Sequence, residues 1–237
     1  MPSGRIAMTL GSYGQFCPVA MAAETLCTRW TMVLVREMVA GSTRFNDLRR
    51  GVPRMSPSLL SQRLNELEVA GIVTRTPVAN EPNVHEYRLT EAGRDLKSVV
   101  EAFGIWGQKW IETQATLKNL DPSLLMWDMR RNLDPVPLPP QRTVVKFRYP
   151  ELAEARRHWW LVVDPHAAVD LCSSDPGYDV DLWVTTDLRT MTSIWMGLTR
   201  VFDAGDKIQL DGDPAIARTM QTWLGLSPFS AQRKLVH

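Results

Sequence analysis

The sequence predicts an α+β protein with two domains joined by a proline-rich segment. Three observations support this prediction. The 237 residues exceed one small domain. Helical patterns surround a single pair of β-prone runs in residues 1–118, whereas residues 143–237 have β-prone runs first and helical patterns last. Between them, in residues 119–142, a short helix that starts at Asp121-Pro122 precedes the run from Asp134 to Pro140, whose prolines favour an extended spacer.

The N-terminal part begins with helical patterns. Residues 21–30 and 31–40 each predict a helix, and Gly41 is a residue typical of a helix C-terminus. A short helix should follow, with Asn46 as its capping residue and Arg50 near its end, before Gly51 and Pro53 stop it.

Ser56-Pro57 has the residue types of another helix start, and Gly71 ends this helix. Its apolar face repeats at helical spacing through Leu60, Leu64 and Leu67. The opposite face carries short polar side chains without an acid among them: Ser58, Ser61, Gln62 and Asn65.

A hairpin and a long helix complete this part. Residues 72–78 and 85–90 are β-prone and flank a turn-rich tip at 79–84. Residues 91–118 then predict one amphipathic helix of about 42 Å. Its apolar side is larger than a small domain needs to cover, which predicts a partner helix. We expect dimerisation through Leu96, Val100, Phe103, Trp106 and Trp110.

Net charge alone argues against a nucleic-acid partner, because the formal charge is only +1. The charge is uneven, however. Residues 1–118 hold 14 basic and 11 acidic residues (+3), and residues 119–237 hold 13 and 15 (−2). Between residues 29 and 63, seven arginines face two acids, a local net of +5. Arginine forks onto phosphate oxygens, so this segment either meets phosphate or is a solvated basic face.

The order of helices followed by a hairpin is that of a winged helix-turn-helix, in which a polar-faced helix reads base edges and basic residues meet phosphates. The alternative is a helical domain whose polar face meets only water. On the first interpretation, the candidate contacts to double-stranded DNA are Arg49, Arg50, Arg54, Ser56, Ser58, Ser61, Gln62, Arg63, Asn65 and, on the hairpin, Arg75, Asn80, Asn83 and His85.

A set of short motifs over residues 15–115 resembles the HxlR family of winged-helix transcription regulators. They are Cys17-Pro18-Val19, Arg29-Trp30, the run from Arg44 to Arg50, Met55-Ser56, the run from Leu59 to Leu67, Ala70-Gly71-Ile72-Val73, and the run from Tyr87 to Gly93. The resemblance implies a homodimer held by terminal helices and a palindromic operator. It also implies a recognition helix over 56–70 and a wing over 72–90, with repression as the commoner mode. Two-fold symmetry predicts half-sites about 10 bp apart or a multiple.

Three cysteines suggest no disulfide framework. Cys17 matches a cysteine that some HxlR-like regulators use to sense oxidants, and a nearby helix N-terminus would favour its thiolate. A small side chain without a redox role is the alternative. We expect Cys27 to serve packing, and we see no spacing of cysteine and histidine that suggests a metal site.

The second domain resembles the sterol-carrier-protein-like fold over residues 143–229. The motifs are the run from Asp181 to Leu188, Trp195-Met196-Gly197 and the run from Ile208 to Pro214. The resemblance implies a lipid-sized tunnel and an apolar small-molecule effector, although a tryptophan-rich core is an equally bland explanation of the composition. The candidate ligand-binding residues are Trp160, Trp183, Met191 and Trp195.

The leading hypothesis is therefore a cytoplasmic, DNA-binding regulator, with no cofactor and no membrane partner. An alternative is a carrier of lipids or other apolar ligands whose winged helix no longer functions. An enzyme is disfavoured, because we find neither a phosphate-binding glycine loop nor a nucleophile triad.

Overall fold

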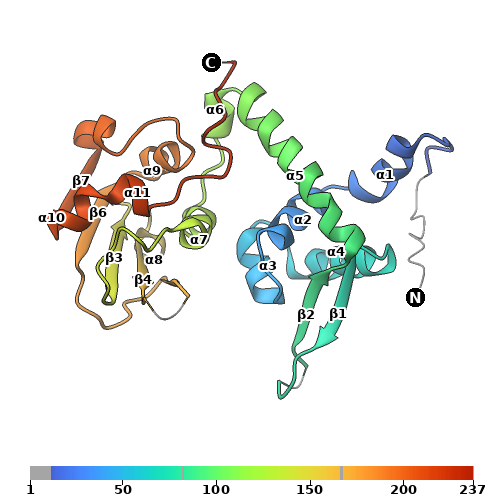
Figure 1. Cartoon of the computed structure of the whole chain (residues 1–237), viewed down its shortest axis with the longest axis horizontal. Helices are drawn as coiled ribbons and strands as arrows, with labels where there is room; N and C mark the ends of the chain where they lie inside the picture. The colour runs from blue at the N-terminus through green and yellow to red at the C-terminus, as the bar shows by residue number, and fades with distance from the viewer. Residues whose placement is uncertain (1–11, 82, 166–167, 237) are drawn as a thin grey trace. The chain divides into compact units, whose positions relative to one another are not determined.

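The computed structural model describes residues 12–81, 83–165 and 168–236. The chain divides into two compact units, Met1–Gly104 and Ile105–His237 (Figure 1). The division falls inside a helix, α5 (Glu91–Trp110), rather than after residue 118. Each unit is therefore described by itself.

The first unit contains α1 (Pro18–Leu26), α2 (Thr31–Val39), α3 (Phe45–Gly51) and α4 (Pro57–Val69). The helix predicted over 21–30 ends early, because Trp30 takes a left-handed conformation (φ 78°) that interrupts helical geometry. The prediction for Asn46 was also wrong: α3 starts one residue earlier, and Arg44 occupies the N-cap position.

The start and end of α4 confirm the sequence prediction. The hydroxyl oxygen of Ser56 accepts a hydrogen bond from the backbone N–H of Leu59 at 3.3 Å, and Pro57 occupies the first turn. Gly71 follows the helix in a left-handed conformation (φ +70°) that favours glycine. The face with Leu60, Leu64 and Leu67 is buried, so the polar face is turned to the surface.

The wing consists of β1 (Val73–Pro77) and β2 (His85–Leu89), paired antiparallel with Val73 opposite Leu89 (Figure 1). At its tip, Asn80 (φ 64°) and Asn83 (φ 67°) both adopt the left-handed conformation that asparagine tolerates better than most residues. The chain before α3 adds to the wing, because the backbone N–H of Tyr87 donates to the carbonyl of Thr43 at 2.8 Å.

The core of the first unit joins every part of this arrangement. It is made by side chains from α2, α3, α4, β1 and α5: Leu34, Val35, Met38, Leu48, Val52, Met55, Leu60, Leu64, Leu67, Ala70, Ile72, Val73 and Val100. The same packing that stabilises the helices therefore fixes α4 relative to the wing.

The long helix predicted over 91–118 is shorter in the structure. α5 ends at Trp110 and a separate short helix, α6 (Thr113–Thr116), follows. The carbonyls near the end of α5 have partners from the C-terminal segment: the backbone N–H of Leu235 donates to Lys109, and the Lys234 ammonium donates to Ile111. These bonds satisfy carbonyls that a helix end leaves open, which allows the helix to stop there.

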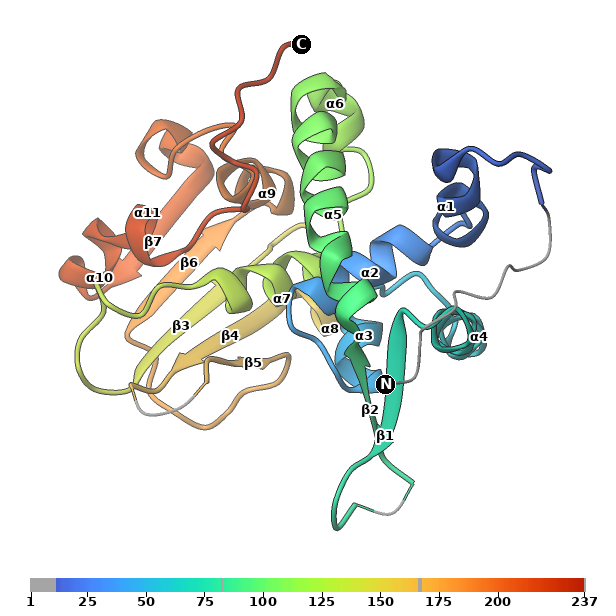
Figure 2. The ribbon, with the colours of Figure 1, turned by 45° about the vertical axis from the view of Figure 1, so that its right-hand side comes forward.

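The second unit is built on a five-stranded sheet in the order β5-β4-β3-β6-β7 (Figure 2). β3 pairs in parallel with β6, and the other neighbours are antiparallel. The strands are β3 (Thr143–Arg148), β4 (His158–Val163), β5 (Asp170–Cys172), β6 (Leu182–Thr186) and β7 (Ile208–Gly212). The helices are α7 (Pro122–Asn132), α8 (Glu154–Arg157), α9 (Leu188–Trp195), α10 (Pro214–Arg218) and α11 (Met220–Trp223), with a 3-10 helix η1 (Phe202–Lys207).

Two predicted helices of this unit end earlier or are interrupted. Gly197, with φ +73°, follows α9 and ends it before the predicted residue 198. The helix predicted over 215–224 divides at Thr219, whose hydroxyl donates back to the carbonyl of Ala215 at 3.0 Å. Such a bond bends a helix.

One face of the sheet and the helices form the core of the second unit. Val145 and Phe147 of β3 pack with Met126 of α7 and Met191 of α9 in this core. The segment 119–142, which the sequence suggested as a linker, thus contributes to the core through α7 and through Leu138, which is buried beyond it. The Asp121 carboxylate caps α7, as the Asp-Pro pattern predicts.

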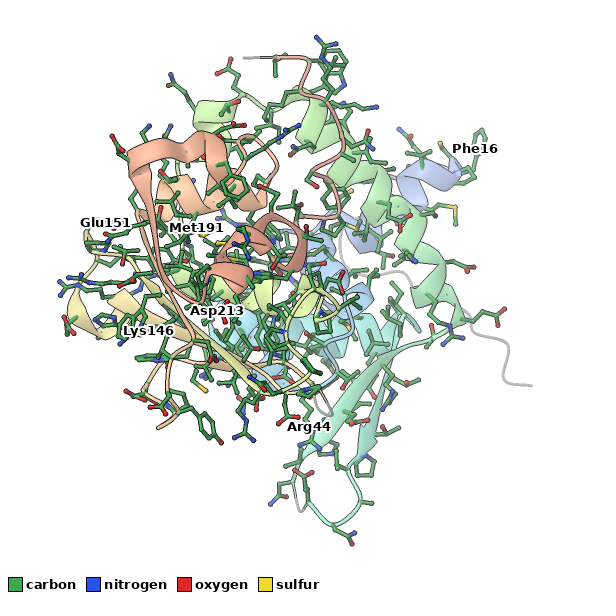
Figure 3. The ribbon with its side chains drawn as sticks, turned by 60° about the vertical axis from the view of Figure 1, so that its left-hand side comes forward. Phe16, Arg44, Lys146, Glu151, Met191 and Asp213 are labelled. Carbon is green, nitrogen blue, oxygen red and sulfur yellow. The ribbon has the colours of Figure 1, made fainter. Side chains whose placement is uncertain are left out.

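The prediction that four residues line one apolar cavity was wrong. Trp160 and Trp183 lie on the same face of the sheet, because both are aligned with Lys146 across neighbouring strands. Met191 and Trp195 pack on the other face, with the helices. Lys146 and Met191 are both labelled in Figure 3. The sequence pattern could not separate these faces, because the strand order depends on the parallel crossover from β3 to β6.

Across the described ranges, no helix is both long enough and apolar enough to cross a membrane.

Candidate nucleic-acid interface

The exposed face of α4 presents polar groups with different freedom. Ser61 and Asn65 are exposed and have no hydrogen-bond partner among the described residues. The Gln62 amide donates to Glu66 at 2.9 Å, and the Ser58 and Ser56 hydroxyls lie 3.2 Å apart. The groups most available for an external partner are therefore the Ser61 hydroxyl and the Asn65 amide.

The predicted basic residues differ in the same way. Arg49, at the end of α3, is exposed and unpaired within the described part of the chain. Arg50 is exposed and lies 3.5 Å from the Asp47 carboxylate, and Arg54 is exposed beside the turn into α4. Arg63 is the exception, because only 14% of its side chain is exposed and its guanidinium pairs with Glu66 and donates to the carbonyl of Arg29. The structure gives Arg63 an internal role.

The wing carries the remaining predicted contacts. Arg75 lies on β1 with its guanidinium 3.2 Å from Nδ1 of His85 on β2. Asn80 and Asn83 are exposed at the tip. These four side chains are distributed along the hairpin rather than gathered with the face of α4.

A clamp between α3 and the wing was not predicted. The guanidinium of Arg44, labelled in Figure 3, donates to both carboxylate oxygens of Glu81 at 3.0 and 2.7 Å. This two-point contact fixes the tip relative to the start of α3. A basic residue 37 positions from an acid has no local sequence signal, so only the fold reveals the pair.

A buried carboxylate connects α2 with α3. Glu37 is fully buried, accepts from the Ser42 hydroxyl at 2.6 Å and lies 3.2 Å from the Arg36 guanidinium. Arg36 also donates to the carbonyl of Gly51 at 3.2 Å. This network positions the end of α3, where Arg49 and Arg50 lie.

The predicted dimerisation residues separate into two groups. Val100 is 7% exposed, and Leu96 packs against the same core, so these two stabilise the first unit itself. Phe103 and Trp106 are each 61% exposed and Trp110 is 49% exposed. With Val99, these three form an exposed apolar stripe along α5.

The cysteines also differ in environment. Cys17 is exposed and precedes α1, where the backbone N–H groups of Ala20 and Val19 lower the pKa of its thiol. Burial and the nearby Asp170 carboxylate raise the pKa of Cys172. Cys27 is exposed, which contradicts the expected packing role.

The geometry described so far agrees with comparisons to other proteins. A model of the HxlR-like helix-turn-helix matches residues 25–115. The HTH-type transcriptional regulator YvaP of Bacillus subtilis is 33% identical over 99 residues, which are 41% of this chain and 92% of YvaP. The chain belongs to the HxlR-like family. Another relative, an HTH-type transcriptional regulator of Mycobacterium tuberculosis, is 41% identical over 39% of this chain, and the match spans 58% of that protein's length.

Solved structures resemble the same part of this HxlR-like chain. The redox regulator HypR in its oxidized form is 37% identical, with a TM-score of 0.37 over 39% of this chain and 95% of HypR. The reduced form of the transcriptional regulator YodB from B. subtilis is 30% identical, with a TM-score of 0.35 over 40% of this chain and 93% of YodB.

Proposed function

We propose that this HxlR-like protein is a cytoplasmic transcriptional regulator, in most instances a repressor, that binds a palindromic DNA operator as a homodimer. The observation that carries the proposal is the surface of α4: unpaired Ser61 and Asn65 on one exposed helix face, with unpaired Arg49 at the end of the preceding helix. Family membership supports the same role.

Each group on this surface has a distinct task in the proposal. A helix in the major groove brings short polar side chains to base edges, where Asn65 can pair with an adenine through two hydrogen bonds. Arg49 and Arg50 lie at the end of α3 and contact phosphates, which fixes the position of α4 without reading sequence. The wing, held by the Arg44–Glu81 clamp, lies along the backbone.

The homodimer is proposed from the apolar stripe on α5. Phe103, Trp106 and Trp110 expose large aromatic surfaces at helical spacing. Burial against the same stripe of a second copy would remove that surface from water in a two-fold arrangement.

Redox control through Cys17 is a further part of the proposal. The thiolate is the reactive form of cysteine, and the lowered pKa together with full exposure favours it at neutral pH. Loss of DNA binding under mild oxidant should therefore be prevented by Cys17→Ser, and loss that persists in this variant would exclude Cys17 as the switch.

The experiment that tests DNA binding is a gel shift of the full chain with DNA from upstream of its own gene, at two salt concentrations. We expect a sequence-dependent shift that weakens with salt, because phosphate contacts release counterions. Arg49→Ala should weaken binding to every sequence, whereas the control Arg200→Ala, an exposed arginine of the second unit, should not. A shift that depends on neither sequence nor salt would overturn the proposal.

The alternative of an apolar-ligand carrier has lost its structural basis. It relied on tryptophans gathered around a cavity, and Trp160 and Trp183 lie on the sheet face opposite Met191.

A further inference from the structure

The sheet of the second unit has a face opposite its helices, and polar and aromatic side chains lie on it in two rows. Side chains alternate between faces along a strand, so residues in register share a face. The first row runs across β4, β3, β6 and β7 as Trp160, Lys146, Trp183 and Asp211. The second row, in the same strand order, is His158, Arg148, Thr185 and Gln209.

The first row holds an ammonium group between two indoles. The Lys146 Nζ lies 4.7 Å from the ring centroid of Trp160 and 4.2 Å from that of Trp183. Within the described residues, no carboxylate pairs with this ammonium. Trp160 is buried, whereas Trp183 is 39% exposed and offers part of its ring to a partner. An uncompensated cation thus lies beside an exposed aromatic ring.

A cleft of about 410 Å³ opens beside Trp183 and the second row. Arg148 lines it, is exposed, and has no partner among the residues that the structure describes. Arg157 lines it too, although Glu154 pairs with its guanidinium. The volume lies within the range of about 300–1,000 Å³ typical of small-molecule sites.

His158 reports the local field in this cleft. Its Nδ1 atom is buried and has no hydrogen-bond partner among the described residues. Burial lowers the pKa of its imidazole, and the positive charge of Lys146 lowers this pKa further. The wall formed by β3 and β4 is therefore electropositive, while Asp211 places a negative charge on the β7 side.

We propose that this cleft binds a small aromatic carboxylate, with its ring on Trp183 and its carboxylate on Arg148 and Lys146. The ring would use the exposed indole surface, and the anion would compensate two cations that lack a carboxylate partner. Asp211 repels the carboxylate from the opposite side, which sets the orientation of the ligand. The site goes beyond the proposed DNA-binding function and does not depend on it, because its binding is measured without DNA.

The test uses isothermal titration calorimetry of the full-length protein with 2-naphthoate, and with neutral 2-naphthamide as the matched probe of equal shape. We expect 2-naphthoate to bind and 2-naphthamide to bind at least about tenfold more weakly, the difference that one charge-assisted hydrogen bond provides. No binding of 2-naphthoate, or equal binding of the two probes, would overturn the proposal.

Variants locate the binding. Arg148→Gln removes an exposed charge that holds no internal contact, so the protein should stay folded while the Kd for 2-naphthoate rises about tenfold or more. Trp183→Leu should weaken both probes, with retention of the fold checked by circular dichroism. The control Arg200→Gln should leave the Kd unchanged. An unchanged Kd in folded Arg148→Gln would place the binding elsewhere and refute the assignment.

Discussion

Gly93 lies where α5 passes the start of the wing, and replacing it by alanine tests how closely these elements pack. A Cβ atom at this position would lie 2.2 Å from the backbone carbonyl oxygen of Ile72, and real Cβ contacts essentially never fall below 3.0 Å. Since the obstacle is backbone, the helix or the strand must move by about 0.8 Å, the difference between those distances. The same carbonyl accepts hydrogen bonds from the backbone N–H and the hydroxyl of Thr90, so movement also strains the turn into α5.

Two opposing effects set the magnitude. Alanine is more favourable than glycine inside a helix by about 1 kcal/mol. Overpacking a core typically costs about 1–3 kcal/mol, and a clash with backbone belongs at the upper end. We therefore expect Gly93→Ala to lower the free energy of unfolding by about 1–2 kcal/mol.

Gly107→Ala provides a control on the same helix. Its added Cβ would meet only the Ile111 side chain at 3.6 Å, an ordinary contact, so we expect stabilisation of up to about 1 kcal/mol. Urea unfolding followed by circular dichroism measures both variants. Stabilisation of the protein by Gly93→Ala to the same extent as by Gly107→Ala would refute the packing argument.

Three other predictions follow from exposed groups. Iodoacetamide should alkylate Cys17 faster than Cys172 at pH 7, because the pKa of the first thiol is lowered and that of the second is raised; equal rates by mass spectrometry would contradict this. Trp106→Asp should convert dimers to monomers in light scattering, whereas Val136→Asp, at a site 85% exposed in the second unit, should not; a Trp106→Asp protein that remains dimeric would exclude the stripe. Glu81→Ala should change stability by less than about 1 kcal/mol, since the clamp is half exposed, but weaken DNA binding several-fold by freeing the wing. Unchanged affinity would show that the clamp does not position the wing for DNA.

Local patterns were sufficient to predict the elements that position the proposed reading surface. Ser56-Pro57, the leucine spacing and Gly71 define α4 by capping and periodicity, which act within a few residues. The wing followed from two β-prone runs around a turn. The strands of the second unit were also located from their apolar runs.

Features that depend on distant contacts were not predictable in this way. The end of α5 depends on Lys234 and Leu235, more than 100 positions later. The buried pairing of Arg63 and the inward packing of Val100 depend on which neighbours the fold supplies, although both residues look like surface contacts in the sequence. The two faces of the sheet could not be assigned to a ligand before the β3–β6 pairing was known.

The central claim is that α4 reads DNA sequence while the end of α3 meets phosphate. The most direct measurement is enrichment of bound sequences from random DNA by the wild type, Asn65→Ala and Arg49→Ala, with affinities followed across salt concentrations. Asn65→Ala should relax the preference at one base pair of each half-site, at a cost of about 1–3 kcal/mol there. Arg49→Ala should weaken all sequences alike and reduce the salt slope by about one per site lost. If both variants kept the wild-type sequence preference, or if the wild type enriched no sequence, α4 would not be the reading helix.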